Sequence, residues 1–222
     1  MSVRYRHVVW DWNGTLLDDA TLCVSIMNKM LARRGLPPIA LPFYQAIIEF
    51  PVEGYYRKLG FDFSAEPFEV VSDEFVALYQ AGWRDCLLQS GAMETIAALC
   101  RAGVSQSVLS ASLSSHLAEQ LSHFGLTGLL HSVSGAEDHH GRGKLHIARD
   151  HAAATGVDSS SILFIGDTAH DAEVAREAGC DCLLVSFGHY SRERLDSIGL
   201  PVAESMGGVL RHILTSEPAG AR

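Results

Sequence analysis

The chain has 222 residues and a formal net charge of −9 at pH 7, with 47% hydrophobic and 19% charged residues. This length suits one large domain or a core domain with a smaller insert, and the composition supplies ample material for a buried core. The acidic balance argues against a nucleic acid or an anionic membrane as partner, because both bind basic surfaces. An anionic substrate must therefore be held by local groups or by a cation.

The N-terminal residues lack the apolar stretch of a secretory signal, and no later segment reaches membrane-spanning length. The cysteines are odd in number and show no CxxC spacing: Cys23, Cys86, Cys100, Cys180 and Cys182. The last two are too close together for ordinary disulfide or zinc geometry. We therefore expect a cytoplasmic protein with reduced, mostly buried thiols.

Short apolar runs recur along the chain and predict the strands of a parallel sheet. The first run, residues 7–10, ends in Asp11 and the turn signal at residues 13–15. The later runs are residues 107–109, 131–133, 161–165 and 182–185. Predicted helices alternate with them at residues 93–102, 115–124, 145–154 and 172–178. Such alternation is typical of a doubly wound α/β fold with a parallel sheet.

The alternation stops between residues 17 and 89, where the pattern is mostly helical. The clearest helix there covers residues 20–34, with Asp18 and Asp19 at the expected N-cap and Gly35 at the expected C-cap. A second helix is predicted at residues 67–83. We therefore expect a small helical cap domain, residues 18–89, inserted into a core domain of residues 1–17 and 90–222.

Acidic residues stand at the carboxyl ends of the predicted strands, which is where parallel sheets bind ligands. Asp11 follows the first strand, and Asp167 follows the strand at residues 161–165. Asp171 lies four residues further on, so a helix that begins there would turn both carboxylates into one crevice. Three carboxylates repel one another unless a cation joins them, and oxygen-only ligands favour Mg²⁺. The sequence therefore predicts a magnesium site.

Two further features suit an anionic ligand beside that cation. Lys144 is one of three lysines, and a lone ammonium facing the carboxylates would orient Asp11 and neutralise phosphoryl charge. The strand at residues 107–109 ends in Ser110, Ala111 and Ser112, which offer hydroxyl and backbone donors. Each of these residues alone is also typical of a cap or a solvated surface, so the prediction depends on their order and spacing.

These motifs resemble, in order, those of the haloacid dehalogenase-like hydrolases. Residues 11–18 (DWNGTLLD) resemble the family's first motif, DxDGTLxD, and residues 166–171 (GDTAHD) resemble its fourth, GDxxxD. Residues 108–110 and Lys144 match the less specific second and third motifs. The helical insert and the tail from Gly188 to Pro201 resemble the phosphoglycolate-phosphatase-like branch.

The resemblance implies a Mg²⁺-dependent phosphatase or phosphotransferase that acts on a small phosphorylated metabolite through an aspartyl-phosphate on Asp11. It implies Lys144 as the group that positions Asp11. The implied metal ligands are Asp11, the backbone carbonyl of Asn13 and Asp167, with Asp171 as a ligand or support. The implied phosphate contacts are Thr15, Ser110, Ala111, Ser112 and Lys144.

Position 13 departs from the family pattern, because the phosphatases carry there an Asp that acts as general acid and base. Asn13 cannot transfer a proton, and general acid–base catalysis is worth roughly 10²–10⁴-fold. Three explanations stay open: a branch with another substrate or another acid, such as His170 or His189; a phosphate-binding relative with weak or no turnover; or an engineered trap of the phosphoenzyme. The sequence indicates neither the physiological substrate nor the oligomeric state.

Three other chemistries fit less well. Dehalogenation needs no metal, whereas Asp167 and Asp171 suit one. Phosphonate cleavage needs a Schiff-base lysine in the cap, but Lys29 and Lys58 have the character of solvated helix charges. The loop around His139 and His140 lacks the cysteine or acidic spacing of a transition-metal site.

Overall fold

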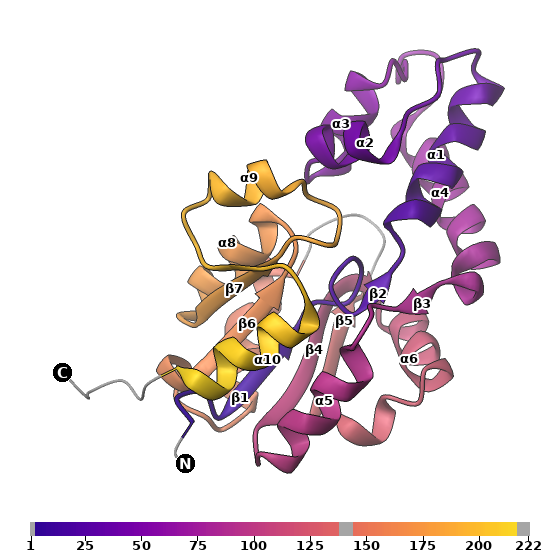
Figure 1. Ribbon diagram of the computed structural model, residues 1–222. Coiled ribbons are helices and arrows are strands. Elements are labelled where there is room, and N and C mark those ends of the chain that lie inside the picture. Colours follow the sequence, from indigo (N-terminus) through magenta and orange to yellow (C-terminus); the bar gives the residue numbers. More distant parts are fainter. Residues whose placement is uncertain (1–2, 138–143, 217–222) are drawn as a thin grey trace.

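A sheet of six parallel strands organises the chain, for which the computed structural model describes residues 3–137 and 144–216 (Figure 1). The strands are β1 (His7–Trp10), β4 (Ser105–Leu113), β5 (Ser132–Ala136), β6 (Ile162–Gly166), β7 (Asp181–Val185) and β8 (Val202–Ala203). Their order is β5–β4–β1–β6–β7–β8, so β1 lies between β4 and β6. The strand order therefore continues from β1 toward β5 on one side and toward β8 on the other. Because ligands bind at the carboxyl ends of the strands where the order reverses, a ligand crevice is expected at the carboxyl end of β1.

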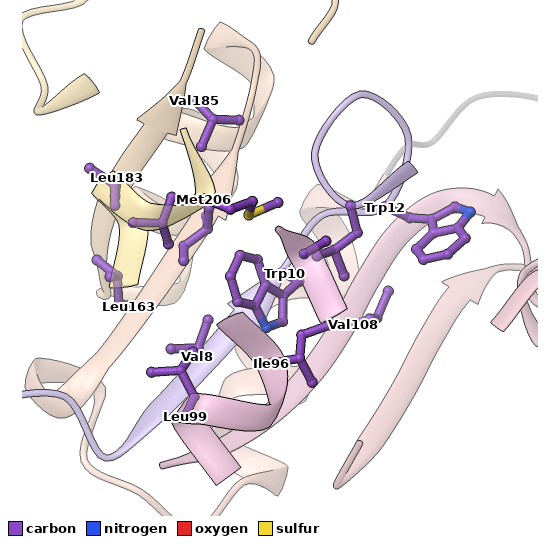
Figure 2. Close-up of a cluster of buried hydrophobic side chains, with 14 of the residues drawn as sticks. Val8, Trp10, Trp12, Ile96, Leu99, Val108, Leu163, Leu183, Val185 and Met206 are labelled. Atoms are coloured by element: carbon purple, nitrogen blue, oxygen red, sulfur yellow. The ribbon is translucent and has the colours of Figure 1, made fainter. Parts of the chain in front are cut away.

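Helices cover both faces of the sheet because the strands are apolar on both faces. Val8 and Trp10 point to the face covered by α5 (Ala92–Arg101), α6 (Ser114–His123) and α10 (Met206–Thr215). Figure 2 shows Trp10 among side chains of this layer, including Ile96 and Met206. Val9 points to the opposite face, covered by α7 (Ala148–Ala154) and α8 (Ala169–Ala178). The sequences of β1 and β6 are therefore mostly continuous hydrophobic runs, without alternation between apolar and polar residues.

Four helices form a separate layer that projects from the carboxyl edge of the sheet (Figure 1). They are α1 (Ala20–Arg33), α2 (Leu41–Ile47), α3 (Val52–Lys58) and α4 (Phe68–Gly82). The chain enters and leaves this layer through two short antiparallel strands, β2 (Leu17–Asp18) and β3 (Leu87–Leu88). The helices share a core of their own, which also takes in Tyr190 and Leu195, just before and within α9 (Arg192–Asp196). The helical layer is thus anchored on the segment that follows β7.

The predicted α/β class with a parallel sheet and a helical insert is confirmed. The sequence did not predict β8, which has two residues, or the pair β2 and β3. The strand predicted at residues 107–109 is longer, since β4 continues to Leu113 with an irregular register after Leu109. Ser110, Ala111 and Ser112 therefore lie within this irregular strand end and not beyond it.

The five cysteines form no disulfide, as expected. Only Cys23 is buried, however, and Cys100 is exposed, so the expectation of mostly buried thiols is wrong. Within residues 3–137 and 144–216, no helix combines the length and the apolar character needed to cross a bilayer.

Candidate functional site

The three predicted carboxylates meet at the carboxyl edge of the sheet. Asp11 follows β1, Asp167 follows β6, and Asp171 lies in the first turn of α8. One oxygen from each of the three carboxylates lies within 4.8 Å of the other two, and all three residues are buried. Residues 156 positions apart in sequence (167 minus 11) are therefore brought together by the adjacency of β1 and β6.

Local geometry explains how two of these carboxylates are held. The backbone N–H groups of Asp167 and Thr168 and the hydroxyl of Thr168 all donate to Asp171 Oδ2, at 3.1, 2.9 and 2.7 Å. Asp171 thus completes a capping box at the start of α8. Gly166 packs directly against Asp171, and a Cβ at that position would overlap its carboxylate. Asp171 is consequently a rigid group whose Oδ2 is already satisfied by the protein.

The turn after Asp11 approaches Asp167 closely. Gly14 has φ +74°, and a Cβ there would overlap both the Asp167 carboxylate and the ring of His189. Only glycine combines this backbone conformation with that approach. Thr15 is fully buried, and its Oγ1 lies 3.1 Å from Asp167 Oδ1 and 3.4 Å from Asp11 Oδ2.

Lys144 is the cation among the carboxylates. Its Nζ forms buried ion pairs with Asp11 Oδ1 and, at 2.5 Å, with Asp171 Oδ1. Burial alone would lower the pKa of Lys144, but the charges of Asp11 and Asp171 raise it above its ordinary value. The ammonium is therefore a permanent charge that holds Asp11 in place.

One ammonium does not balance three carboxylates. Burial raises the pKa of Asp11 to about 7 and that of Asp167 to about 6, and repulsion from neighbouring carboxylates adds to both increases. Lys144 and Asp171 form the best-compensated pair, so the pKa of Asp171 is lowered despite its burial. When all three carboxylates are ionised, three charges of −1 and one of +1 leave −2. The hard oxygen donors and this excess charge fit a Mg²⁺ ion, for which Asp11 and Asp167 are the available carboxylates.

The second predicted strand contributes hydroxyl groups beside Asn13. Ser112 Oγ donates to Asn13 Oδ1 at 2.8 Å, and the backbone N–H of Ser112 donates to Ser110 Oγ at 3.0 Å. Ser110 is buried and Ala111 is exposed. Three of the predicted phosphate contacts thus lie at the end of β4, with Ser112 joined directly to the turn after β1.

A wall of the site that the sequence did not predict is centred on Asp19. Asp19 occupies the N-cap position of α1, as expected, but makes no side-chain capping bond. Its carboxylate accepts hydrogen bonds from Gly14 N (2.9 Å), Asn13 Nδ2 (2.7 Å) and the Tyr79 hydroxyl (2.7 Å). His189 Nε2 lies 3.3 Å from Asp19 Oδ1, the oxygen that also accepts from Gly14 N. The residue expected to cap a helix therefore organises the turn that carries Asn13.

His189 links this wall to the helical layer and to Asp167. Its ring Nδ1 lies 2.9 Å from the Tyr44 hydroxyl of α2, and its backbone N–H donates to Asp167 Oδ2 at 2.5 Å. Burial alone would lower the pKa of His189, but Asp19 and then Asp167 raise it to about 9. His189 is thus an imidazolium at neutral pH.

The two alternative acids named from the sequence are placed differently. His189 is buried in the site, whereas the ring of His170 lies on the first turn of α8, 6.3 Å from the ring of Phe50 and 3.6 Å (Nδ1) from Glu173 Oε2. Lys29 is exposed and Lys58 pairs with Glu49, consistent with solvated charges. His139 and His140 lie outside the described residues.

Asp19, Tyr44 and Tyr79 were missed by sequence reasoning. The doublet at residues 18–19 was the one available signal, because one N-cap explains a single acid and leaves the other unexplained. Asp18 is exposed, so the buried member of the doublet is Asp19. The tyrosines carry no sequence signal, because each is spaced like a core residue of its helix.

Comparison with known proteins agrees with this geometry. Residues 8–185 match the family model of the haloacid dehalogenase-like hydrolases. The chain is 29% identical over 202 residues to a phosphoglycolate phosphatase of Caulobacter vibrioides, covering 86% of this chain and 83% of that protein. It is 28% identical over 206 residues to an N-acetylmuramic acid 6-phosphate phosphatase of Pseudomonas putida, covering 86% and 87%. A solved structure of a predicted phosphatase from Clostridium acetobutylicum has the same fold, with TM-score 0.79 at 20% identity over 96% of this chain and 99% of that one.

Proposed function

Since this chain belongs to the haloacid dehalogenase-like hydrolase family, we propose that it is a Mg²⁺-dependent phosphatase that acts on a small phosphorylated metabolite, with Asp11 as nucleophile. The observation that carries this proposal is the buried cluster of Asp11, Asp167 and Asp171 around Lys144. Relatives named as phosphatases of phosphoglycolate and of N-acetylmuramic acid 6-phosphate support a small phosphate ester as substrate.

The proposed chemistry proceeds in two displacements. A carboxylate oxygen of Asp11 forms a bond to phosphorus while the bond from phosphorus to the leaving-group oxygen breaks, which gives an aspartyl-phosphate. The oxygen of a water molecule then forms a bond to phosphorus while the bond from phosphorus to the Asp11 oxygen breaks, which restores the Asp11 carboxylate and releases inorganic phosphate and a proton to solvent. Lys144 holds Asp11 and neutralises phosphoryl charge throughout. Bound Mg²⁺ would supply further positive charge at the phosphoryl oxygens, held by Asp11, the Asn13 carbonyl and Asp167, with Asp171 in support.

Further groups have proposed roles around the phosphoryl group. Ser110 would donate a hydroxyl hydrogen bond and the backbone at Ala111 an N–H, while Thr15 and Ser112 would donate only by turning their hydroxyl hydrogens away from Asp167 and Asn13. We propose that residues 18–89 are a cap domain over this site, supported by the contacts of Tyr44 with His189 and of Tyr79 with Asn13. Five cysteines without a disulfide support a reducing compartment such as the cytoplasm.

Hydrolysis of p-nitrophenyl phosphate tests the proposal directly. We expect turnover with Mg²⁺, loss of turnover with a chelator, and no turnover above the blank for Asp11→Asn. The matched control is Asp158→Asn, an exposed acid away from the site, which is expected to retain wild-type turnover. Undiminished turnover by Asp11→Asn refutes the nucleophile. Metal-dependent binding of phosphate analogues without product release by the wild type would instead establish a phosphate-binding protein.

A further inference from the structure

We propose that Asp19 is a positioning residue that fixes the Asn13 carboxamide and, through its negative charge, excludes an ionised carboxylate from position 13. This inference deepens the proposed function and rests on it for its catalytic consequence. It assigns a reason to the departure of position 13 from the family pattern: Asn13 and Asp19 form a matched pair.

The hydrogen bonds around Asn13 show the match. Its Nδ2 donates to Asp19 Oδ2 and to the Tyr79 hydroxyl, each at 2.7 Å, and the Tyr79 hydroxyl donates to the same Asp19 oxygen. Its Oδ1 accepts from Ser112 Oγ at 2.8 Å. Both amide N–H bonds and the carbonyl oxygen are thus used within the protein. The carboxamide is held from three sides and has no N–H left for a leaving group.

An Asp at position 13 would lose this arrangement. Its second oxygen would replace Nδ2 and face Asp19 Oδ2 at about the same separation, as one acceptor against another. Asp19 is 1% exposed, so water cannot separate the two charges. His189 already balances Asp19 at 3.3 Å and cannot neutralise a second carboxylate there as well. A carboxylate at position 19 therefore requires a donor at position 13, which is an amide or an acid whose proton is held by Asp19 and is withheld from a leaving group.

Exchanging the two side chains restores the hydrogen bonds, while the ion pair of His189 with position 19 becomes a contact with a neutral amide oxygen. With Asn at position 19, its amide nitrogen can donate to Asp at position 13, and its carbonyl oxygen can still accept from Gly14 N and His189 Nε2. The Tyr79 hydroxyl can accept from the new amide and donate to the new acid. The amide and the carboxylate can thus exchange positions without a change in side-chain shape. The exchange places the carboxyl group at position 13, next to Ser112.

A four-protein cycle tests the pairing: the wild type, Asn13→Asp, Asp19→Asn and the double exchange. Turnover is measured with saturating Mg²⁺ on p-nitrophenyl phosphate, whose leaving group needs little protonation, and on glycerol 2-phosphate, whose leaving group needs a proton. We expect the double exchange to raise kcat on the alkyl phosphate, relative to the aryl phosphate, by about 10²-fold or more over wild type. We expect Asn13→Asp alone to fall short of this ratio by at least about tenfold, because its carboxylate faces Asp19.

The leaving-group ratio separates positioning from a purely structural role, because a structural defect lowers kcat on both substrates alike. If Asn13→Asp alone matches the double exchange in that ratio, Asp19 does not control position 13 and the proposal is overturned. The proposal is equally overturned if the double exchange shows no gain in the ratio while the wild type is active.

Thermal unfolding of the same four proteins gives a readout that does not depend on turnover. Each single substitution places like groups against each other and is expected to lower the melting temperature by about 4 °C or more, and the double exchange is expected to recover most of that loss. Additive losses would overturn the pairing. If no protein in the cycle hydrolyses either substrate but the melting temperatures are coupled, the proposed function fails and the Asn13–Asp19 pair stands.

Discussion

The two walls of the site differ in how their buried charge is balanced. On the sheet side, Asp11, Asp167 and Asp171 share one ammonium, Lys144, and an excess negative charge remains. On the opposite side, the single carboxylate of Asp19 receives three hydrogen bonds, pairs with His189 and is complete within the protein. The first wall therefore needs a partner from solution, whereas the second needs only the protein's own groups. A divalent cation should act on the first wall and leave the second almost unchanged.

The largest effect on the sheet-side wall is expected from Asp167→Asn, which removes one negative charge while keeping the side-chain shape. For the wild type, Mg²⁺ at 100 times its dissociation constant is expected to stabilise the fold by about 2.7 kcal/mol. We expect the variant to lose most of this stabilisation and its Mg²⁺-dependent turnover, as followed by thermal melts with and without Mg²⁺. Asp158→Asn is again the matched control, and an equal Mg²⁺ response in both variants would remove Asp167 from the metal site.

A smaller effect is expected from Tyr79→Phe, which changes the wall around Asp19. The change removes a hydroxyl that donates to buried Asp19, which is expected to cost about 1–3 kcal/mol in the free energy of unfolding. The Mg²⁺ response of the variant should stay as in the wild type. Tyr55→Phe is the matched control, because its buried hydroxyl has no hydrogen-bond partner among the described residues. Equal losses in the two variants would show that the hydrogen bond to Asp19 contributes nothing.

The smallest effect at neutral pH concerns two buried histidines away from both walls, His7 in β1 and His151 in α7. Burial lowers the pKa of His7 and of His151 to about 4 from 6.5, and repulsion between nearby imidazoles adds to it. Since the unfolded chain binds these protons more readily, their contribution to stability is present above pH 6.5 and is lost as the pH falls from there toward about 4.

His151→Gln removes one of these titrating groups while keeping a side chain that can bond to Ser107 and Ser134. In urea unfolding at a series of pH values, the free energy of unfolding should fall less steeply below pH 6.5 for this variant than for the wild type. Identical slopes would assign the acid loss of stability to other groups, with the site carboxylates as the first candidates.

The sequence predicted the sheet and its carboxylate wall because both depend on short-range patterns. Apolar runs mark the strands, and parallel strands place whatever follows them at one edge, so Asp11 and Asp167 were found from local context. Lys144 was found from its order among the motifs, and the structure places its ammonium against Asp11.

The wall around Asp19 was missed because it depends on contacts between segments far apart in sequence. Tyr79 reaches Asp19 from sixty residues away, and a tyrosine at a core spacing has no property that reveals where its hydroxyl points. Asp19 was interpreted as a helix cap because capping is the commonest role for an acid before a helix. Two-residue strands such as β8 are too short to show a period.

The chain enters and leaves the helical layer through a ladder of two residue pairs, Leu17 with Leu88 and Asp18 with Leu87. Because the chain departs and returns at that single junction, an insertion, deletion or replacement among the four helices leaves the register of the six-stranded sheet untouched. The carboxylate cluster and the helical layer can therefore diverge at separate rates, and grafting a different helical layer at this junction is a direct test of whether that layer sets substrate selectivity.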